Sequence, residues 1–370
     1  MRALIICTSV SWGGLEQTAL RDAVELQKRG VDVSMLGLNK GVLFEKAKEA
    51  GVDYHSINSA NKHLNFELIF KLKKIIKELG IQVIHMHSFN TVFSVLVAVM
   101  GVKVKVFATR HIHVEHVKKD AFHRWYLNRI DMLFAISDFA RQNLIETYPL
   151  PEERIKTLYI GINTEQFKRT EEKRNRFKDD FSHIQLGSKV VGVVGRIDPM
   201  KGQLEFIEAI PSILTRHPDT QFLVVGRPTS GLENEYLEYI KYKARDLGVD
   251  NFVTFTGFYE DVSAPLSVMD VFVMPSYFEA FGLIALQAMA CNVPVVATAK
   301  GSIDEIIPSE EYGIKIRPKD SRAISEAVVR LLDNKDLRDR MQQNSYQRLK
   351  KVFDERTYFE KLLHYYKSDL

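Results

Sequence analysis

The chain has 370 residues, which exceeds one typical hydrophobic core and predicts two domains of ordinary size. Hydrophobic residues make up 45% of the sequence and charged residues 26%, which excludes a disordered chain and indicates a soluble globular protein. The net charge is +4, and its excess lies in residues 1–165, which hold 22 Lys and Arg against 17 Asp and Glu. This bias is too weak and too scattered to indicate nucleic-acid binding, but it suits an anionic partner such as a membrane surface, a lipid phosphate or an acidic glycan.

Strand-like and helix-like segments alternate along the first half of the chain. We expect strands over residues 2–7, 31–36, 81–85 and 104–109, and helices over residues 15–29 and 66–79. The helix over 66–79 carries apolar residues three and four positions apart, which is the period of an amphipathic helix. Alternation of this kind predicts βα units and a parallel sheet covered by helices on both faces.

The alternation stops near Gly161 and begins again at Val190. Residues 167–180 between these points are dense in charged side chains without apolar periodicity, so we expect a surface connection near a domain boundary. Further strands are expected over residues 190–195, 222–226, 252–256, 271–275 and 294–298, with a helix over 203–215 among them. Each half therefore predicts a doubly wound parallel sheet of its own, and the fold class is α/β.

The two cysteines and the N-terminus bear on the cellular compartment of the protein. Cys7 and Cys291 both lie in apolar runs, so a disulfide framework is not expected and a reducing, cytoplasmic compartment fits. The N-terminus begins with a strand-like run and shows no pattern of a secretory signal. The most apolar segment, residues 92–102, is about half as long as a helix that spans a bilayer.

Two adjacent glycines follow the first expected strand. Gly13 and Gly14 join that strand to the helix over 15–29. Glycines at such a junction allow close approach of the backbone to a ligand, and the start of a helix favours an anion. The dinucleotide-binding fingerprint needs three glycines at set spacing, which this loop lacks, so an NAD dehydrogenase is disfavoured. A plain tight turn remains the alternative.

A second loop joins the first strand of the second half to a helix. It carries Gly195 and Arg196 directly after the strand, and Lys201 just before the helix over 203–215. Two cations beside a helix N-terminus suit a diphosphate, because Arg can contact two oxygens at once and Lys supplies a point charge. The alternative is a pair of solvated surface cations. We favour the anion site because the loop lies at the carboxyl edge of a sheet.

A third segment follows the expected strand over 271–275. It carries Glu279 in a turn, and Gly282 opens a very apolar helix that contains Gln287. Glu279 and Gln287 are eight residues apart, so both can face one ligand if Glu279 lies at the helix start. A carboxylate that only satisfies the helix dipole would explain Glu279 but not a polar Gln287 on an apolar helix.

Together these segments resemble the retaining nucleotide-sugar glycosyltransferases of family four (group 1), which have the GT-B fold. The resemblance covers nearly the whole chain. Its strongest parts are Gly195-Arg196 with Lys201-Gly202 and the stretch from Glu279 to Cys291. The Gly13–Glu16 loop, Ser137-Asp138 and Gly161–Asn163 also resemble landmarks of the family. It implies two Rossmann-like domains that face a central cleft. Residues 1–165, joined by the C-terminal helix 355–370, would form the acceptor side, and residues 166–354 the donor side.

The resemblance also implies roles for individual residues. Arg196 and Lys201 match the pair that holds the diphosphate, and Glu279 matches the acidic residue that binds sugar hydroxyls of the donor. His111 matches the donor-site histidine of the N-terminal domain, with His113 as the neighbouring choice. Further donor-binding positions are Gly13, Gly14, Gly195, Phe281, Gly282, Leu283 and Gln287. The family has a second Glu where this chain has Gln287, which puts donor affinity and nucleotide preference in doubt.

Histidines cluster in the first half of the chain. His85 and His87 end one expected strand, and His111 and His113 follow another. A His-x-His pair can bind a metal, but no carboxylate or thiol accompanies these pairs at ligand spacing. No Asp-x-Asp pair occurs in the chain, so we expect neither a metal nor another cofactor, and the fixed cations would supply the electrostatic stabilisation.

The expected function is transfer of a sugar from a nucleotide-diphosphate sugar, UDP- or GDP-linked, to a saccharide or lipid-linked acceptor. Two alternatives stay open: a nucleotide-sugar epimerase of the same fold, and a non-catalytic nucleotide-sugar-binding protein, which Gln287 motivates.

The helix over 66–79 carries Lys71, Lys73, Lys74 and Lys77 opposite its apolar stripe. These lysines are either merely solvated or form a peripheral contact with the cytoplasmic face of the membrane.

Overall fold

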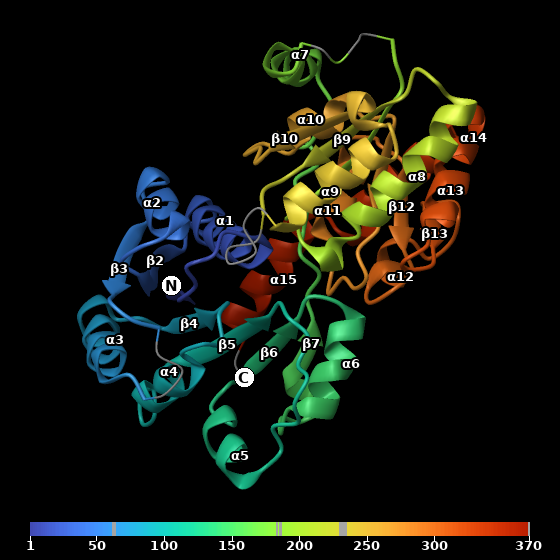
Figure 1. Cartoon of the computed structure of the whole chain (residues 1–370). Coiled ribbons are helices and arrows are strands. Elements are labelled where there is room, and N and C mark those ends of the chain that lie inside the picture. The colour runs from blue at the N-terminus through green and yellow to red at the C-terminus, as the bar shows by residue number, and fades with distance from the viewer. Residues whose placement is uncertain (61–63, 183, 185–186, 229–234, 369–370) are drawn as a thin grey trace. The chain divides into compact units, whose positions relative to one another are not determined.

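The computed structural model describes residues 1–60, 64–182, 184, 187–228 and 235–368 (Figure 1). The chain divides into two compact units. Unit 1 comprises Met1–Ile160 and Arg356–Leu370, and unit 2 comprises Gly161–Glu355. Each unit is an α/β domain built on one parallel sheet, as the alternation of strands and helices predicts.

Unit 1 holds a sheet in which the described residues form seven parallel strands. The spatial order is β3-β2-β1-β4-β5-β6-β7. The strands are β1 (Arg2–Cys7), β2 (Asp32–Leu38), β3 (Asp53–Ile57), β4 (Val83–Met86), β5 (Lys105–Arg110), β6 (Met132–Ala135) and β7 (Ile155–Thr157). The helices are α1 (Gly14–Lys28), α2 (Val42–Glu49), α3 (Phe66–Leu79), α4 (Val92–Ala98), α5 (Ala121–Leu127), α6 (Asp138–Thr147) and α15 (Glu355–Lys367). The order reverses direction between β1 and β4, which is the switch point of a Rossmann-like sheet.

Unit 2 repeats this design with six parallel strands among its described residues, in the order β10-β9-β8-β11-β12-β13. The strands are β8 (Val190–Val194), β9 (Gln221–Val225), β10 (Val253–Gly257), β11 (Val271–Met274), β12 (Val295–Thr298) and β13 (Ile314–Ile316). The helices are α7 (Glu171–Asp180), α8 (Gln203–Arg216), α9 (Glu235–Asp246), α10 (Ser263–Val268), α11 (Leu283–Ala290), α12 (Ile303–Ile306), α13 (Ser321–Asp333) and α14 (Lys335–Val352). Its switch point lies between β8 and β11.

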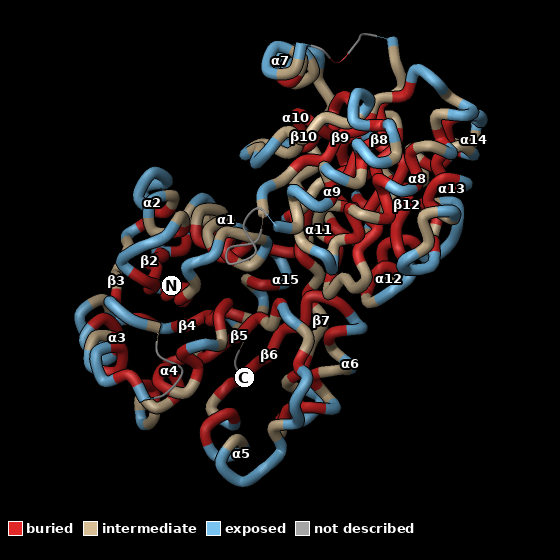
Figure 2. The backbone as a smooth tube through the Cα atoms, viewed as in Figure 1, coloured by how far each residue is buried: buried red, intermediate tan, exposed pale blue. Residues whose placement is uncertain are grey.

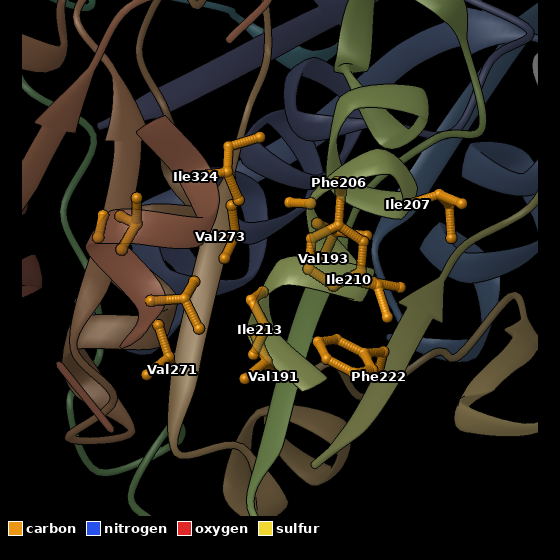
Figure 3. Packing of buried hydrophobic residues seen from close by; sticks show 14 of the residues in the cluster. Val191, Val193, Phe206, Ile207, Ile210, Ile213, Phe222, Val271, Val273 and Ile324 are labelled. Atoms are coloured by element: carbon orange, nitrogen blue, oxygen red, sulfur yellow. The ribbon is translucent and has the colours of Figure 1, made fainter. Parts of the chain in front are cut away.

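The core of unit 2 lies between its sheet and the helices that cover it. Val191 and Val193 of β8 pack against α8, whose Phe206 meets Phe222 of β9 with ring centroids 6.0 Å apart (Figure 3). Strands β8, β9, β11 and β12 are almost entirely buried, as Figure 2 shows, whereas the edge strand β10 is half-buried to exposed. Burial on both faces is expected for a parallel sheet with helices on each side, and it fixes the loops at the ends of the strands.

The C-terminal helix α15 completes the core of unit 1. Its Tyr358, Phe359, Leu362 and Tyr366 are buried in the same hydrophobic cluster as Ala3 and Ile5 of β1 and Ala19 of α1. Arg21 and Arg29 of α1 lie over the Phe359 ring, at 5.5 and 4.4 Å from its centroid. The last residues of the chain therefore form part of the same domain as the first.

The segment over residues 167–180, expected as a surface connection near a domain boundary, is mostly exposed or half-buried, but it contains a helix that was not expected, α7 over Glu171–Asp180. The hydroxyl of Thr170 accepts a hydrogen bond from the Lys173 amide and caps this helix. Phe177 is the only residue of α7 that is fully buried among the described residues, and its ring packs against Phe181 and Tyr259. A single aromatic residue thus anchors a helix that has no apolar stripe for periodicity to detect.

Within the described part of the chain, we find no helix long and apolar enough to cross a membrane.

Candidate active site

The switch point of unit 2 brings together two of the predicted loops. The segment from Gly195 to Gly202 leaves the carboxyl end of β8, and the segment from Pro275 to Gly282 leaves the carboxyl end of the neighbouring strand β11. The Tyr277 amide donates to the Met200 carbonyl at 2.9 Å and ties the two loops to each other. Ligands of open α/β sheets bind at this kind of position, so the topology supports a site here.

Lys201 and Glu279 form an ion pair across these loops. The Lys201 ammonium lies 2.5 Å from the Glu279 carboxylate, and the two side chains are 26% and 15% exposed. Lys201 ends a 3₁₀ turn over Pro199–Lys201 that Asp198 caps by accepting from the Met200 amide. The pair therefore places one fixed cation and one carboxylate side by side at the edge of the sheet, with solvent access to both.

Arg196 lies on the same loop as Lys201. Its carbonyl accepts a hydrogen bond of 2.7 Å from the Gln203 side chain, which holds the loop against the start of α8. Its side chain is exposed, and within the described ranges no hydrogen-bond or ion-pair partner is assigned to its guanidinium. Arg196 is therefore available to an anionic ligand, whereas Lys201 is already paired.

Two glycines allow the backbone to pass close to this pair. Gly202 has φ +69°, and a Cβ at this position would lie 2.2 Å from the Pro275 carbonyl oxygen. Gly301 has φ +80°, and its Cβ would lie 2.0 Å from the Glu279 carbonyl oxygen. Real Cβ atoms do not approach oxygen so closely, so both positions require glycine for steric as well as conformational reasons. The glycines thereby fix the backbone that carries Lys201 and Glu279.

Glu279 lies in the connection between β11 and α11, as expected, and not at the start of a helix, so the condition under which Glu279 and Gln287 would face one ligand along a helix is not met. Helix α11 begins at Leu283, and Glu279 instead forms an isolated parallel bridge with Gly301. Its carbonyl accepts from the Ser302 amide at 3.1 Å, which holds it in an extended loop. Gln287 lies in the second turn of α11 and is partly exposed.

The other predicted donor-binding residues of this loop differ in exposure. The Phe281 ring is buried and packs edge-on against Phe353, with ring centroids 6.1 Å apart. Its backbone carbonyl accepts from the Ser302 hydroxyl at 2.8 Å. Gly282 caps α11 with φ 89°, and Leu283 is half-buried. A contact between the Phe281 side chain and a ligand would require that the ring leave the core.

The switch point of unit 1 carries the glycine pair and the histidines. Gly13 caps α1, and its amide donates to the Glu16 carboxylate at 2.8 Å. Glu16 is buried, so this carboxylate already satisfies one of the free amides of the helix start. Among the described residues, no acceptor is assigned to the Gly14 amide, which leaves it available to a ligand.

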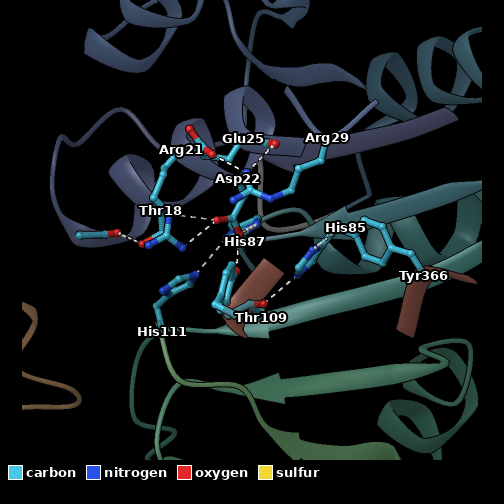
Figure 4. A network of polar contacts seen from close by, with 12 residues as sticks. Thr18, Arg21, Asp22, Glu25, Arg29, His85, His87, Thr109, His111 and Tyr366 are labelled. Carbon is cyan, nitrogen blue, oxygen red and sulfur yellow. Dashed lines mark hydrogen bonds and ion pairs between the residues drawn. The ribbon is translucent and has the colours of Figure 1, made fainter. Parts of the chain in front are cut away.

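A buried network of polar side chains begins at His111, directly after β5 (Figure 4). Nε2 of His111 lies 3.1 Å from Nδ1 of His87, and Nε2 of His87 lies 3.6 Å from Oδ2 of Asp22 on α1. The Tyr358 hydroxyl donates to the same oxygen at 2.5 Å, and the Arg21 guanidinium contacts Oδ1 at 2.8 Å. Five residues, from α1, from α15 and from the loops that directly follow β4 and β5, thus form one connected network.

His85 and His113 do not belong to this hydrogen-bond network. Nδ1 of His85 lies 2.6 Å from the Tyr366 hydroxyl, and Nε2 lies 2.7 Å from the Thr109 hydroxyl, so both ring nitrogens are occupied. His113 is half-buried beside Asn143 and stacks on the Phe139 ring. Within the described residues, no group of three or more His, Cys, Asp and Glu side chains could hold a metal ion.

Burial controls the protonation of the three buried histidines. Loss of solvent lowers the pKa of His85 and His111 to about 3 and that of His87 well below its ordinary value, so all three are neutral near pH 7. Burial raises the pKa of Asp22, while the Arg21 charge opposes this rise. The network is therefore a set of neutral rings that ends on a carboxyl paired with a permanent cation.

The sequence patterns gave no role to Asp22, Arg21 or Tyr358, and they raised His87 only as part of a His-x-His pair that could bind a metal. Asp22 lies on the buried face of α1 with Ala19, Ala23 and Leu26, and a carboxylate on such a face is rare unless it has a partner. That position is the signal that could have identified it. Its partner Tyr358 is 336 residues away, and no local pattern links the two.

The fold defines the class of protein. The structure superposes on that of the Anabaena protein Alr3699/HepE in complex with UDP with a TM-score of 0.84, covers 99% of each chain and shares 18% sequence identity. This likeness establishes the fold, and two Rossmann-like domains of this kind constitute the GT-B fold of glycosyltransferases.

Sequence comparison gives the family. The model for Glycosyltransferase Family 4 matches residues 12–166, and the model for Glycosyl transferases group 1 matches residues 175–348. An uncharacterized glycosyltransferase of Methanocaldococcus jannaschii is 30% identical over 329 residues, which are 79% of this chain and 80% of that protein. The capsular polysaccharide biosynthesis glycosyltransferase CapM of Staphylococcus aureus is 27% identical over 278 residues, 72% of this chain and 71% of CapM. The chain belongs to the group 1 glycosyltransferases of family 4.

Proposed function

We propose that this glycosyltransferase moves a sugar from a UDP- or GDP-sugar to a saccharide or lipid-linked acceptor, with retention at the anomeric carbon and without a metal. The observation that carries the proposal is the Lys201–Glu279 pair at the switch point of unit 2, with the exposed Arg196 on the same loop as Lys201. The likeness to a UDP-bound GT-B structure and to a capsular polysaccharide enzyme supports the donor class and the type of product.

The two cations would hold the diphosphate of the donor. Arg196 offers a planar fork of N–H groups that can contact two phosphate oxygens, and its side chain is exposed and has no assigned partner among the described residues. Lys201 would share its charge between Glu279 and the phosphate. When the sugar–phosphate bond breaks, negative charge grows on the departing diphosphate. Preorganised cations stabilise that charge more strongly in the transition state than in the ground state.

The carboxylate and the histidine would act on the sugar. Glu279 would orient donor hydroxyls and stabilise the positive charge that develops on the sugar ring, and neutral His111 would bond a hydroxyl of the sugar. Gln287 would bond the ribose as a neutral acceptor. Gly13, Gly14, Gly195, Gly282 and Leu283 would contribute backbone contacts, and the buried Phe281 ring restricts that residue to its backbone.

Substitution of the two cations tests this assignment. Lys201→Ala and Arg196→Ala should each lower turnover by at least about a hundredfold, which is the scale for loss of one preorganised donor group. Arg216→Ala is the matched control, because Arg216 is an exposed cation of α8 in the same unit, paired with Asp333 at 3.5 Å. Near-normal turnover in both site variants would overturn the proposal. NMR of the product gives the anomeric configuration directly, and added EDTA tests independence from metals.

Two alternatives make different products. An epimerase of the same fold would convert the donor without an acceptor, so chromatography after incubation with donor alone separates it from a transferase. A non-catalytic binding protein would bind the donor tightly with no turnover on any acceptor. In that case Gln287→Glu would restore no activity.

We also propose that unit 1 contacts a membrane surface when the acceptor is lipid-linked. Phe66 and Phe70 of α3 are 62% and 70% exposed, and Lys73 and Lys77 follow them on the same helix face. Exposed aromatic residues beside lysines suit an interface with anionic lipid. Lys71 is not part of this surface, because its ammonium bonds the Ser56 carbonyl. The buried free thiols of Cys7 and Cys291 fit the cytoplasmic side of such a membrane.

Vesicle sedimentation tests the membrane contact. The protein should bind vesicles that contain phosphatidylglycerol more strongly than neutral vesicles, and Lys73→Glu with Lys77→Glu should abolish the difference. The matched control reverses Lys350 and Lys351 of α14, which are exposed lysines of unit 2. Equal binding by both double variants would refute a contact through α3.

A further inference from the structure

The hydrogen-bond network of unit 1 has a direction, because its far end is an acceptor. Arg21 keeps its charge at all relevant pH values and lies 2.8 Å from Oδ1 of Asp22, so the carboxylate form of Asp22 is favoured. The Tyr358 hydroxyl then donates to Oδ2, as an ionised carboxyl can only accept.

The same oxygen fixes the tautomer of His87. Nε2 of His87 lies 3.6 Å from Oδ2, is fully buried and has no other hydrogen-bond partner among the described residues. A nitrogen lone pair that faced a carboxylate would be repelled, so the proton of His87 lies on Nε2. Nδ1 of His87 is then an acceptor, and it lies 3.1 Å from Nε2 of His111. His111 must therefore donate from Nε2.

We propose that Asp22 and His87, held in place by Tyr358, are positioning residues that lock His111 in the neutral Nε2–H tautomer and leave its Nδ1 as an acceptor for a hydroxyl of the donor sugar. This inference rests on the proposed function, because it gives His111 a specific role towards the donor. In the described part of the chain no protein group is assigned to Nδ1 of His111, and the side chain retains 9% exposure at the switch point of unit 1.

A protonated Asp22 would reverse the direction of the hydrogen bonds and make Nδ1 of His111 a donor. If Asp22 were protonated and donated to Nε2 of His87, then His87 would donate from Nδ1 and His111 would present Nδ1–H as a donor. Burial favours that form, since it raises the pKa of Asp22, and the adjacent Arg21 charge opposes it. The contact of 2.8 Å between Arg21 and Oδ1 of Asp22 decides between the two, because a carboxylate accepts a hydrogen bond from a guanidinium more strongly than a neutral carboxyl does.

NMR of the ¹⁵N-histidine-labelled wild-type protein tests the tautomer directly. Long-range ¹H–¹⁵N correlation distinguishes protonated from unprotonated ring nitrogens, and comparison with His111→Gln assigns the signals. We expect a protonated Nε2 and an unprotonated Nδ1 for His111 at pH 7.5. An Nδ1–H tautomer or an imidazolium in the wild type would overturn the inference, whatever the activity of the protein proves to be.

Calorimetric binding then tests the consequence for the donor. In Asp22→Asn the side-chain amide can donate to His87 and release the tautomer of His111. The affinity for UDP-glucose or GDP-mannose should fall about tenfold, while the affinity for UDP or GDP should stay within twofold, because the nucleotide lacks the sugar. Tyr366→Phe is the matched control, since it removes a buried hydroxyl of α15 that bonds His85 and is not part of the network of Asp22, His87 and His111.

The two assays separate the two ideas. Equal losses for nucleotide and nucleotide-sugar in Asp22→Asn would assign Asp22 a merely structural role and refute the positioning. No binding of any nucleotide-sugar to the wild type would refute the proposed function, and the tautomer measurement would still decide the positioning of His111.

Discussion

The hydroxyl of Tyr358 donates to the carboxylate of Asp22 at 2.5 Å, across 336 residues of sequence. Both side chains are buried, and the bond joins the C-terminal helix α15 to the first helix of the same unit. Helix α15 thus contributes both apolar area and a polar contact to unit 1, so the stability of this unit depends on the last 15 residues of the chain.

Removal of one α15 side chain should therefore destabilise unit 1. Phe359 is fully buried in the core cluster, and Phe359→Ala should lower the free energy of unfolding by about 3 to 5 kcal/mol, the usual cost of a large cavity in a core. Lys361→Ala removes an exposed side chain of the same helix and should change it by less than about 0.5 kcal/mol. Urea unfolding followed by circular dichroism measures both, and equal effects would show that α15 does not support the core.

The buried histidines should make stability depend on pH. The folded-state pKa of His85 and His111 is about 3, well below the ordinary value of 6.5. The unfolded chain therefore binds protons that the folded chain does not, and stability that is present above pH 6.5 is lost as the pH falls towards 3. Each of the two histidines should contribute a slope of up to about 1.4 kcal/mol per pH unit. The raised pKa of Asp22 acts in the opposite direction.

A variant isolates one contribution to this slope. His85→Gln retains groups that can bond the Tyr366 and Thr109 hydroxyls but does not titrate. Between pH 6 and pH 4.5 the free energy of unfolding of this variant should fall less than that of the wild type, and the difference should equal the contribution of one histidine to the slope. Urea unfolding at a series of pH values measures this difference, and parallel curves for the two proteins would contradict the assignment of the slope to His85.

Gly202 should tolerate no side chain. Gly202→Ala adds a Cβ 2.2 Å from the Pro275 carbonyl oxygen, so the loop with Lys201 must shift, and we expect loss of donor binding together with reduced stability. Gly248→Ala is a closely matched control, because Gly248 has the same φ of +69° but nothing within 4 Å of the added Cβ. That variant should cost only about 1 to 2 kcal/mol of backbone strain and leave donor affinity unchanged. Identical effects of the two substitutions would remove the steric argument.

Gln287 offers a test by gain of function. A carboxylate accepts a hydrogen bond from a hydroxyl more strongly than an amide does, so Gln287→Glu should lower the dissociation constant of the donor several-fold. Gln287→Ala should raise it. Calorimetric titration with UDP- and GDP-sugars measures both changes. If neither substitution alters affinity, Gln287 does not contact the nucleotide.

Sequence patterns predicted the scaffold well and the polar network poorly. The helix over 66–79 has the bounds of α3, because its apolar residues lie at helical spacing on one buried face. Helix α7 was missed because one buried residue, Phe177, anchors it. The extended position of Glu279 depends on its bridge to Gly301, and the partners of Asp22 come from distant segments. Such contacts depend on tertiary packing, which local periodicity does not encode.

The structure of the protein with bound UDP or GDP tests the central claim most directly. We predict that the Arg196 guanidinium and the Lys201 ammonium both lie at about 2.7 to 3.0 Å from diphosphate oxygens, at the carboxyl ends of β8 and β11. A nucleotide whose phosphates lie in solvent or on another part of the sheet, with Arg196 and Lys201 in contact with neither, would contradict the account.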